Sequence, residues 1–334
     1  MFTCAKIYGG RTYLEKHLSA NDYYNENEHV TGKWIGKAAK RLEIEGKPIN
    51  AKDKAFEALR QNLHPSGSKE HLTPNNDKKS IRFFDFQCSA QKSVSIMAVV
   101  MNDKRLYNAH DRAAAIAFAE LERFAGFRSG KLRDRELSGN LCAAAFRHDA
   151  SRDLDPQIHT HFVVANATYD EKTKRWLALD EREMFKAIRY AGKVYQNQLA
   201  HECRNLGYEI ESIRNAKGVI EGFEIVGVNK EIRELYSKRR AEVEAGIERF
   251  QKEKGRMPTD REIHVITRET RGQKMAEITT DKVRQQQRSQ LSAATLAELE
   301  SLKNRSLKAA IERLKSKSAL PAYGIGERRH TAGF

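Results

Sequence analysis

The sequence has no long hydrophobic run. Nowhere in its 334 residues does an apolar stretch approach the roughly 18 residues that a membrane-spanning helix needs. The N-terminal residues Met1 to Ile7 are too short a hydrophobic stretch for a signal peptide. We therefore expect a soluble protein of the bacterial cytoplasm, with no membrane insertion.

Cysteine is scarce, and a nucleotide-binding loop is missing. The four cysteines, Cys4, Cys88, Cys142 and Cys203, show no C-x-x-C spacing. We interpret them as buried thiols in a reducing compartment. The sequence contains no G-x-x-x-x-G-K-[ST] loop, no helicase motif and no repeat of fixed period. It therefore predicts no NTPase site and no nucleotide cofactor.

Acidic residues are outnumbered by basic ones. The chain has 60 lysines and arginines against 45 aspartates and glutamates, which gives a net charge of +15 and a pI near 9.6. Such an excess indicates a polyanionic partner, and nucleic acid is the first candidate.

Hydrophobic periodicity predicts both helices and strands. Apolar residues recur every three or four positions, as in amphipathic helices, over 51–63, 104–125, 181–206, 232–250 and 292–315. Gly126 is the expected stop of the second helix, and Thr259 to Glu262 form a capping box. Strands are predicted at 2–7, 81–88, 141–148 and 158–168, a hairpin over 208–228, and either a strand or a helix at 94–101.

This order of elements favours an α+β fold. Strands lie early and late around a central helix and are followed by helices alone, so we expect a central antiparallel sheet with helices packed on one face. A helical C-terminal appendage follows it. We divide the chain into a core over 1–228, a charged helical extension over 229–318 and a loosely ordered tail over 319–334.

Three histidines are spaced so that one metal ion could bind all of them. If residues 158 to 166 form a strand, His159 and His161 project from the same face of the sheet. His148 ends the preceding apolar run, and a hairpin connection would bring it beside the other two. Three neutral imidazoles leave coordination positions open for a substrate oxygen. The sequence therefore predicts a reactive divalent metal site whose ion it does not identify.

The same segment resembles a known family. The resemblance rests on F-R-H-D-A-S-R-D-L-D-P-Q-I-H-T-H (146–161), on F-D-F-Q-C-S-A-Q-K-S-V-S (84–95), and on Tyr13, Tyr23 and Tyr24. It extends through R-W-L-A-L-D (175–180), Y-Q-N-Q-L-A-H-E (195–202), L-G-Y-E-I-E (206–211) and S-K-R-R-A-E-V-E (237–244). Together these motifs look like the MobF group of conjugative relaxases, enzymes that nick plasmid DNA at its transfer origin. The resemblance covers roughly the first three quarters of the chain.

The resemblance implies a palm-like antiparallel sheet with the histidines near its centre. It also implies attack by a tyrosine on a scissile phosphodiester, which leaves a 5′-phosphotyrosyl adduct and a free 3′-hydroxyl. Tyr13 is the first candidate nucleophile, followed by Tyr23 and then Tyr24. Asp85 either orients one imidazole or takes the tyrosine proton.

DNA binding requires basic and aromatic contacts beyond the metal site. The candidate contacts are Lys33, Trp34, Lys37, Lys78, Lys79, Lys92, Arg128, Lys131 and Arg152. Trp34 could equally be a core residue. The resemblance implies single-stranded or hairpin origin DNA, accessory relaxosome proteins and a coupling protein as partners, with the extension over 229–318 closing over the DNA.

Other functions fit parts of the pattern. A rolling-circle replication initiator shares the histidine pair and the tyrosine chemistry. A catalytically silent origin-binding protein would share only the basic charge. A hydrolase with a metal-activated water would share the histidines, but the tyrosines argue against it. Formation of a covalent tyrosine–DNA adduct distinguishes the nicking enzymes from the other two.

Overall fold

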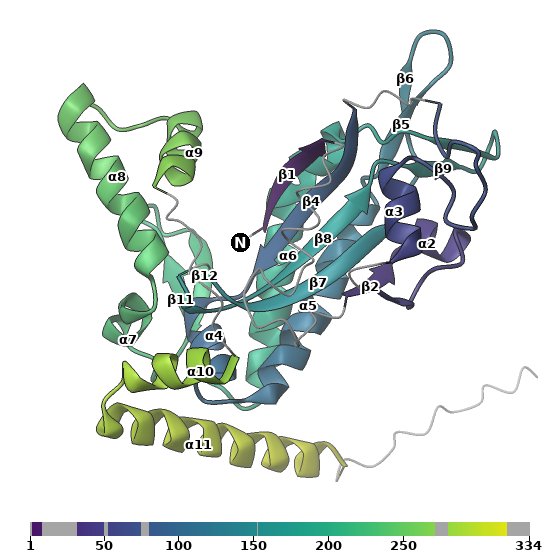
Figure 1. The fold of residues 1–334 in the computed structure, drawn as a ribbon. Coiled ribbons are helices and arrows are strands. Elements are labelled where there is room, and N and C mark those ends of the chain that lie inside the picture. The colour runs from purple at the N-terminus through teal and green to yellow at the C-terminus, as the bar shows by residue number, and fades with distance from the viewer. Residues whose placement is uncertain are drawn as a thin grey trace, which may run out of the picture.

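The fold is built on one central sheet. The computed structural model describes residues 2–8, 32–49, 53–74, 80–151, 153–270 and 280–318. Its largest sheet has six strands in the order β1-β4-β8-β7-β2-β3, and every neighbouring pair is antiparallel (Figure 1). The strands are β1 (Phe2–Tyr8), β2 (Gly32–Ile35), β3 (Pro48–Ile49), β4 (Ile81–Ser89), β7 (Ala143–Ala150) and β8 (Pro156–Ala165). The predicted α+β class is confirmed.

Two long helices cover one face of this sheet. Helices α5 (Lys104–Glu122) and α6 (Arg182–Asn205) run behind the strands in Figure 1, and α4 (Lys92–Val99) packs at their end. Alternate residues of β4 and β8 point toward them, including Phe86 and Phe162, which are buried in the main core. The ring of Phe162 lies 4.9 Å from that of Phe118 in α5. Because side chains alternate along a strand, the residues between these core positions point to the opposite face, away from the helices.

A second core covers one end of the opposite face. It gathers Trp34, Phe56, Phe83 and Val163, with α2 (Lys37–Arg41) and α3 (Lys54–Arg60) around it. The rings of Phe56 and Phe83 are stacked at 4.9 Å. Because side chains alternate, the polar residues that follow along β4 and β8 project from this same face.

Three small hairpins extend the sheet body. They are β5 (Gly126–Ser129) with β6 (Asp134–Leu137), β9 (Thr168–Asp170) with β10 (Arg175–Leu177), and β11 (Ile210–Arg214) with β12 (Ile220–Ile225). Only the last was predicted. Gly126 was expected to end a helix, but α5 already ends at Glu122 and Gly126 begins β5.

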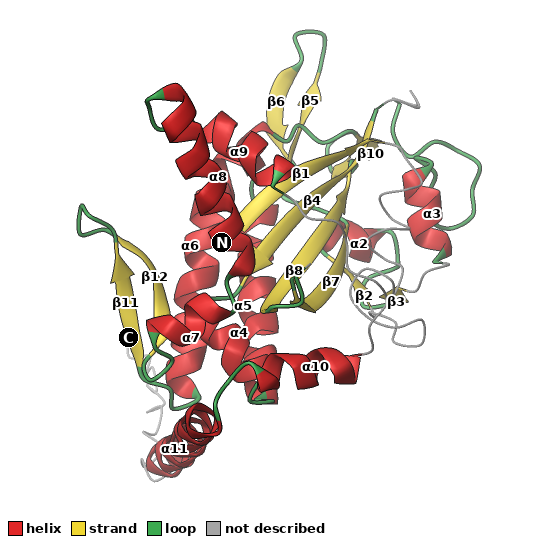
Figure 2. Ribbon diagram, turned by 60° about the vertical axis from the view of Figure 1, so that its left-hand side comes forward, coloured by secondary structure: helices red, strands yellow, loops and turns green. Residues whose placement is uncertain are grey.

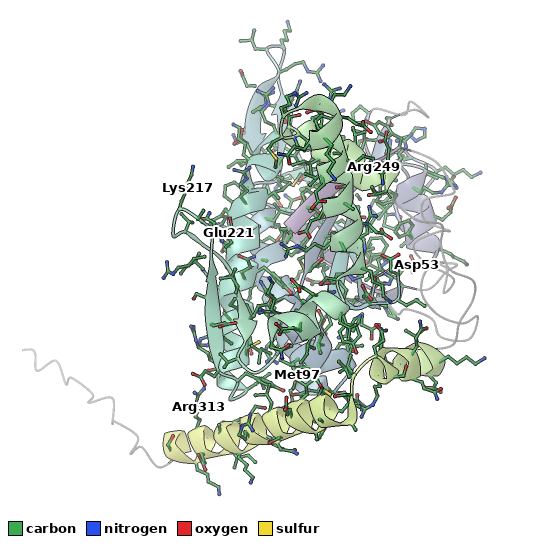
Figure 3. All side chains as sticks on the ribbon, turned by 90° about the vertical axis from the view of Figure 1, so that its left-hand side faces the viewer. Asp53, Met97, Lys217, Glu221, Arg249 and Arg313 are labelled. Atoms are coloured by element: carbon green, nitrogen blue, oxygen red, sulfur yellow. The ribbon has the colours of Figure 1, made fainter. Side chains whose placement is uncertain are left out.

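The C-terminal part is helical, as predicted. It comprises α7 (Lys230–Leu235), α8 (Lys238–Lys254), α9 (Asp260–Glu269), α10 (Thr280–Ser289) and α11 (Ala293–Ser318). Figure 1 shows α8 and α9 projecting from the body, and Figure 3 labels Arg249 on α8 and Arg313 on α11. The capping box is confirmed, since the Thr259 backbone N–H donates to the Glu262 carboxylate at 2.8 Å. Among the helices described, none is long and apolar enough to cross a bilayer.

One helical prediction was wrong. The stripe over 232–250 predicted a single helix, but the chain leaves helical conformation between α7 and α8, at Tyr236 and Ser237. Tyr236 is fully buried, and its hydroxyl donates a hydrogen bond to the Gln287 carbonyl. This tertiary contact outweighs the local helical period. Tyr236 also belongs to the main core, so the extension shares that core with the sheet.

A polar chain crosses the interface between the sheet and the helices. His110 in α5 lies between Thr160 Oγ1, at 2.8 Å from its Nε2, and the Tyr195 hydroxyl, at 2.6 Å from its Nδ1. Burial lowers the pKa of His110 to about 3 from its ordinary value of 6.5. The imidazole is therefore neutral at pH 7.

This burial predicts a loss of stability in acid. The unfolded chain takes up a proton at His110 near pH 6.5 and the folded protein only near pH 3, so unfolding binds protons throughout that window. Between pH 6.5 and 5 the free energy of unfolding should fall by about 2 kcal/mol from this residue. Urea unfolding at pH 7, 6 and 5 checks it, with His110→Gln as the reference. Equal losses in the two proteins would contradict the expectation.

Candidate metal centre on the sheet

The three predicted histidines come together at the open face of the sheet. His148 in β7 pairs directly with His159 in β8, and His161 lies two residues further along. All three imidazoles therefore project from the face away from α5 and α6. Their ring centroids are 5.2 Å apart for His159 and His161, 5.3 Å for His148 and His159, and 5.4 Å for His148 and His161.

Two of the imidazoles have an oxygen acceptor at Nδ1. His159 Nδ1 lies 2.9 Å from the Gln157 carbonyl oxygen, and His161 Nδ1 lies 2.9 Å from each carboxylate oxygen of Asp85. Since both partners accept hydrogen bonds, each Nδ1 donates, and the neutral ring keeps Nε2 as its acceptor atom. Burial, reinforced by the neighbouring His161, lowers the pKa of His159 to about 4. His159 is thus neutral at pH 7, the form that binds metal ions.

The imidazole nitrogens of the three histidines are suitable donors for a metal ion. Among the residues that the structure describes, no group of three or more His, Cys, Asp or Glu side chains already stands in a metal-holding arrangement. The rings of His148 and His159 are inclined by 23°, whereas His161 stands at 89° and 69° to them. Imidazole donors suit zinc, copper, nickel and iron.

Asp85 supports the cluster from the neighbouring strand. It lies in β4 between Ala5 of β1 and Val163 of β8, and its side chain is only 6% exposed. It lies on the open face next to His161, and its orienting role stays a prediction. Such outer carboxylates fix the tautomer and direction of a ligating imidazole.

Replacing Asp85 by asparagine should weaken metal binding about tenfold, because the amide keeps one acceptor oxygen but loses the charge that favours Nδ1–H on His161. Titration calorimetry of the metal-free protein with Ni²⁺ measures the effect. Asp170→Asn is the matched control, since Asp170 is a buried carboxylate in β9 with partners of its own. If Asp85→Asn binds Ni²⁺ as tightly as the wild type, Asp85 does not orient His161 for metal binding.

The turn between the two histidine-bearing strands is held by distant parts of the chain. The Asp155 carboxylate accepts from the Lys238 backbone N–H at 3.0 Å, 83 residues away. The Leu154 carbonyl accepts from Gln287 Nε2 at 2.7 Å, 133 residues away. Neither Lys238 nor Gln287 was predicted from the sequence, because no motif marks a contact made at such a separation. The helical extension therefore contacts the metal-site hairpin directly.

Lys92 also contacts this hairpin. Its ammonium group donates to the Pro156 carbonyl at 3.0 Å, at the start of β8. Burial lowers the pKa of Lys92 to about 8. The amine of Lys92 is therefore hydrogen-bonded to the backbone of β8. A contact between Lys92 and DNA stays a prediction.

The other predicted DNA contacts differ in their exposure, and Lys33 and Lys37 line the same cavity as His148. Trp34 is 1% exposed and packs on Phe56 at 5.8 Å, which leaves its ring no surface for base stacking in this structure. Lys33 and Lys37 are exposed. Lys131 is exposed at the tip of the β5–β6 hairpin, which projects from the body in Figure 2, and Arg128 binds Asp180 at 2.5 Å. Tyr13, Tyr23, Tyr24, Lys78, Lys79 and Arg152 lie outside the described residues.

A cavity of about 930 Å³ opens beside His148. It lies at the edge of β7, between β2 and α5, and Thr160 also borders it. Its basic residues face acidic ones: Arg147 binds Asp111, and Lys37 Nζ lies 3.9 Å from Glu122. The cavity is therefore not a purely basic groove.

Known proteins with similar sequences act in conjugation. The chain is 36% identical over 210 residues to the multifunctional conjugation protein TraI of Escherichia coli, and 33% identical over 210 residues to that of strain K12. Each match covers 58% of this chain and 12% of the TraI protein. The chain thus spans a small part of the length of these relatives.

Solved structures extend the similarity to the whole fold. The metal-bound structure of the conjugative relaxase TrwC in complex with oriT DNA matches with a TM-score of 0.72 and 29% identity, over 90% of this chain and 98% of that one. The copper-bound complex matches with a TM-score of 0.72 and 28% identity, over the same shares. TrwC complexed with a 27-mer DNA that comprises the recognition hairpin and the cleavage site matches with a TM-score of 0.71. The TrwC relaxase family model matches residues 8–294, most of the sequence, and the chain belongs to that family.

Proposed function

We propose that this protein is a DNA relaxase of conjugative plasmid transfer, which nicks one strand at a transfer origin. The observation that carries the proposal is the cluster of His148, His159 and His161, with Asp85 behind it, in a member of the TrwC relaxase family. The similar TrwC structures hold oriT DNA in metal-bound and copper-bound forms. Because the chain spans only 12% of TraI, the proposal concerns the nicking step alone.

The proposed reaction is a transesterification. A tyrosine oxygen attacks phosphorus, the bond from phosphorus to the 3′-oxygen breaks, and that oxygen takes up a proton. The products are a 5′-phosphotyrosyl adduct and a free 3′-hydroxyl. Since one phosphodiester replaces another, the step is reversible by religation and needs no nucleotide cofactor.

His148, His159 and His161 would hold one divalent ion, with magnesium, manganese, zinc and other ions as candidates. When bound, the ion supplies Lewis-acid stabilisation of charge on the phosphoryl oxygens. The residues themselves contribute three imidazole donors, a hydrogen bond from His161 Nδ1 to Asp85 and a largely buried setting. Asp85 touches His161 through both oxygens, which favours an orienting role over acceptance of the tyrosine proton.

Tyr13 is the proposed first nucleophile, with Tyr23 and Tyr24 as further candidates. A tyrosine hydroxyl titrates near pH 10 in water, so it needs a nearby cation or base to react at neutral pH. A metal-bound phosphate beside the histidine cluster is where such activation would occur.

The proposed substrate is single-stranded or hairpin origin-of-transfer DNA in the bacterial cytoplasm. The net charge of +15 favours this polyanion. Accessory relaxosome proteins and a coupling protein are proposed partners. We propose residues 1–228 as the catalytic core, 229–318 as the extension that closes over DNA, and 319–334 as a tail.

A denaturing gel tests the proposal. The protein is incubated with Mn²⁺ and an origin oligonucleotide, and we expect a covalent protein–DNA species that resists denaturant. Tyr13→Phe, or the double change with Tyr23→Phe, should remove it because the proposed nucleophilic oxygen is lost. Tyr190→Phe is the matched control, since Tyr190 is an exposed tyrosine on α6.

A shifted oligonucleotide without any adduct would instead support an origin-binding protein. Cleaved DNA without an adduct would support a hydrolase. An adduct on replication-origin DNA but not on transfer-origin DNA would support a replication initiator. Any of these outcomes would overturn the relaxase proposal.

A further inference from the structure

We infer that Thr160 is a positioning residue for His159 and His161, the proposed metal ligands on either side of it in β8. Its hydroxyl is hydrogen-bonded to His110, which in turn is hydrogen-bonded to Tyr195. The inference rests on the proposed function only in taking His159 and His161 as ligands. It assigns a role to a polar chain on the opposite side of the sheet from the imidazoles.

The geometry of this chain is closed and buried. Thr160 is 6% exposed, and His110 and Tyr195 are 0% exposed. The Thr160 hydroxyl lies 2.8 Å from His110 Nε2, and His110 Nδ1 lies 2.6 Å from the Tyr195 hydroxyl. A neutral imidazole donates from one nitrogen and accepts at the other, so both ring nitrogens have a partner whichever tautomer is present. The chain therefore ties β8 to α5 and α6 together.

Its surroundings make these directional bonds important. Near Thr160, Ile158 and Phe162 on β8 and Ala109 and Ala113 on α5 belong to the apolar main core. Arg147, which pairs with Thr160 from β7, binds Asp111 of α5 at the cavity. Apolar packing is not directional, whereas a hydrogen bond fixes both distance and angle. The Thr160 hydroxyl thus adds a directional restraint on the position of β8 over the helices.

The two ligands beside Thr160 depend on that setting. The Nδ1 partner of His159 is Gln157, which lies on the same strand and moves with it. His159 therefore has no restraint from this bond against movement relative to His148 on β7. A displacement of β8 relative to β7 would move His159 and His161 together with respect to His148, and it would strain the ladder that pairs these strands. Anchoring of Thr160 opposes that displacement.

The competing explanation is that the chain contributes stability alone. Thr160→Val keeps the shape of the side chain and removes the hydroxyl, whereas Thr160→Ser keeps the hydroxyl. Thr168→Val is the matched control, because Thr168 is a fully buried threonine in β9 whose hydroxyl contacts Ser138 and Asn140. All three proteins are expected to fold, and thermal melting records any loss of stability.

The test is Ni²⁺ binding to the metal-free protein of 334 residues by titration calorimetry. DNA is left out because Thr160 also borders the cavity, where a change could alter DNA binding. We expect about tenfold weaker binding in Thr160→Val, at the lower end of the effect of outer-shell changes. Thr160→Ser should bind like the wild type. Thr168→Val should melt at a lower temperature and still bind Ni²⁺ like the wild type.

Wild-type affinity in a folded Thr160→Val protein would overturn this inference and leave the proposed function standing. Absence of Ni²⁺ binding by the wild type would instead overturn the proposed metal centre, and the inference with it. If Thr160→Val does not fold, Tyr195→Phe gives the decisive measurement. That change keeps the ring and removes the far end of the chain, so weaker Ni²⁺ binding supports the inference and unchanged binding overturns it.

Discussion

Replacing His159 by alanine should abolish tight metal binding and slow DNA cleavage by about a thousandfold or more, since the ion is expected to supply several kcal/mol of transition-state stabilisation. His159 is the ligand candidate with both other rings within 5.3 Å between centroids. Its removal takes away the central donor of the cluster. Single-turnover cleavage of an origin oligonucleotide measures the rate, and Ni²⁺ calorimetry measures binding.

His201→Ala is the control for the loss of an imidazole, since His201 is exposed on α6 and accepts a hydrogen bond from the Asn205 side chain. It should bind metal and cleave like the wild type. Cleavage at the wild-type rate by His159→Ala would contradict the assignment of His159 as a metal ligand. The proposed tyrosine nucleophile would not be contradicted by that result.

A chain ended after residue 228 should not keep a stable fold. The four removed residues Ile232, Tyr236, Leu299 and Leu302 belong to the main core together with the strands and α5. Each buried side chain of this size contributes about 1.5–3 kcal/mol, so their loss costs on the order of 10 kcal/mol. That is comparable to the whole stability of a typical domain, about 5–15 kcal/mol. Circular dichroism and thermal melting check the result.

The matched control ends after residue 318 and retains every helix that the structure describes. It should melt like the full chain. A cooperative transition at an unchanged temperature in the shorter protein would show that the first 228 residues fold alone. That result would favour the domain division proposed from the sequence over the shared core.

Local patterns predicted the longest helices and the longest strands of the sheet. The helices α5 and α6 and the strands β4, β7 and β8 lie within a few residues of their expected bounds. The segment over 94–101 could not be resolved, because α4 is buried on all sides from Ser93 to Val99 and therefore shows no period. The β5–β6 and β9–β10 hairpins are short, with strands of three or four residues, and give too few alternating positions to recognise.

The site divides in the same way. His159 and His161 were predictable because two residues of one strand share a face, and His148 because a short connection returns the chain beside them. Asp85 was predicted only by resemblance to a family. The contacts of Lys238 and Gln287 join segments 83 and 133 residues apart, and nothing in the local sequence specifies them. The break between α7 and α8 was missed for the same reason, because Tyr236 makes its hydrogen bond to Gln287, a residue far along the chain.

The hairpin of β7 and β8 has a consequence for the order of folding. His148 and His159 face each other across a short connection, whose closure has little entropic cost and is fast. The bonds that Lys238 and Gln287 make to the same turn must wait until the chain closes much longer loops. During refolding, the imidazoles should therefore become neighbours early, while the rigidity of the turn between them arrives with the last long-range contacts.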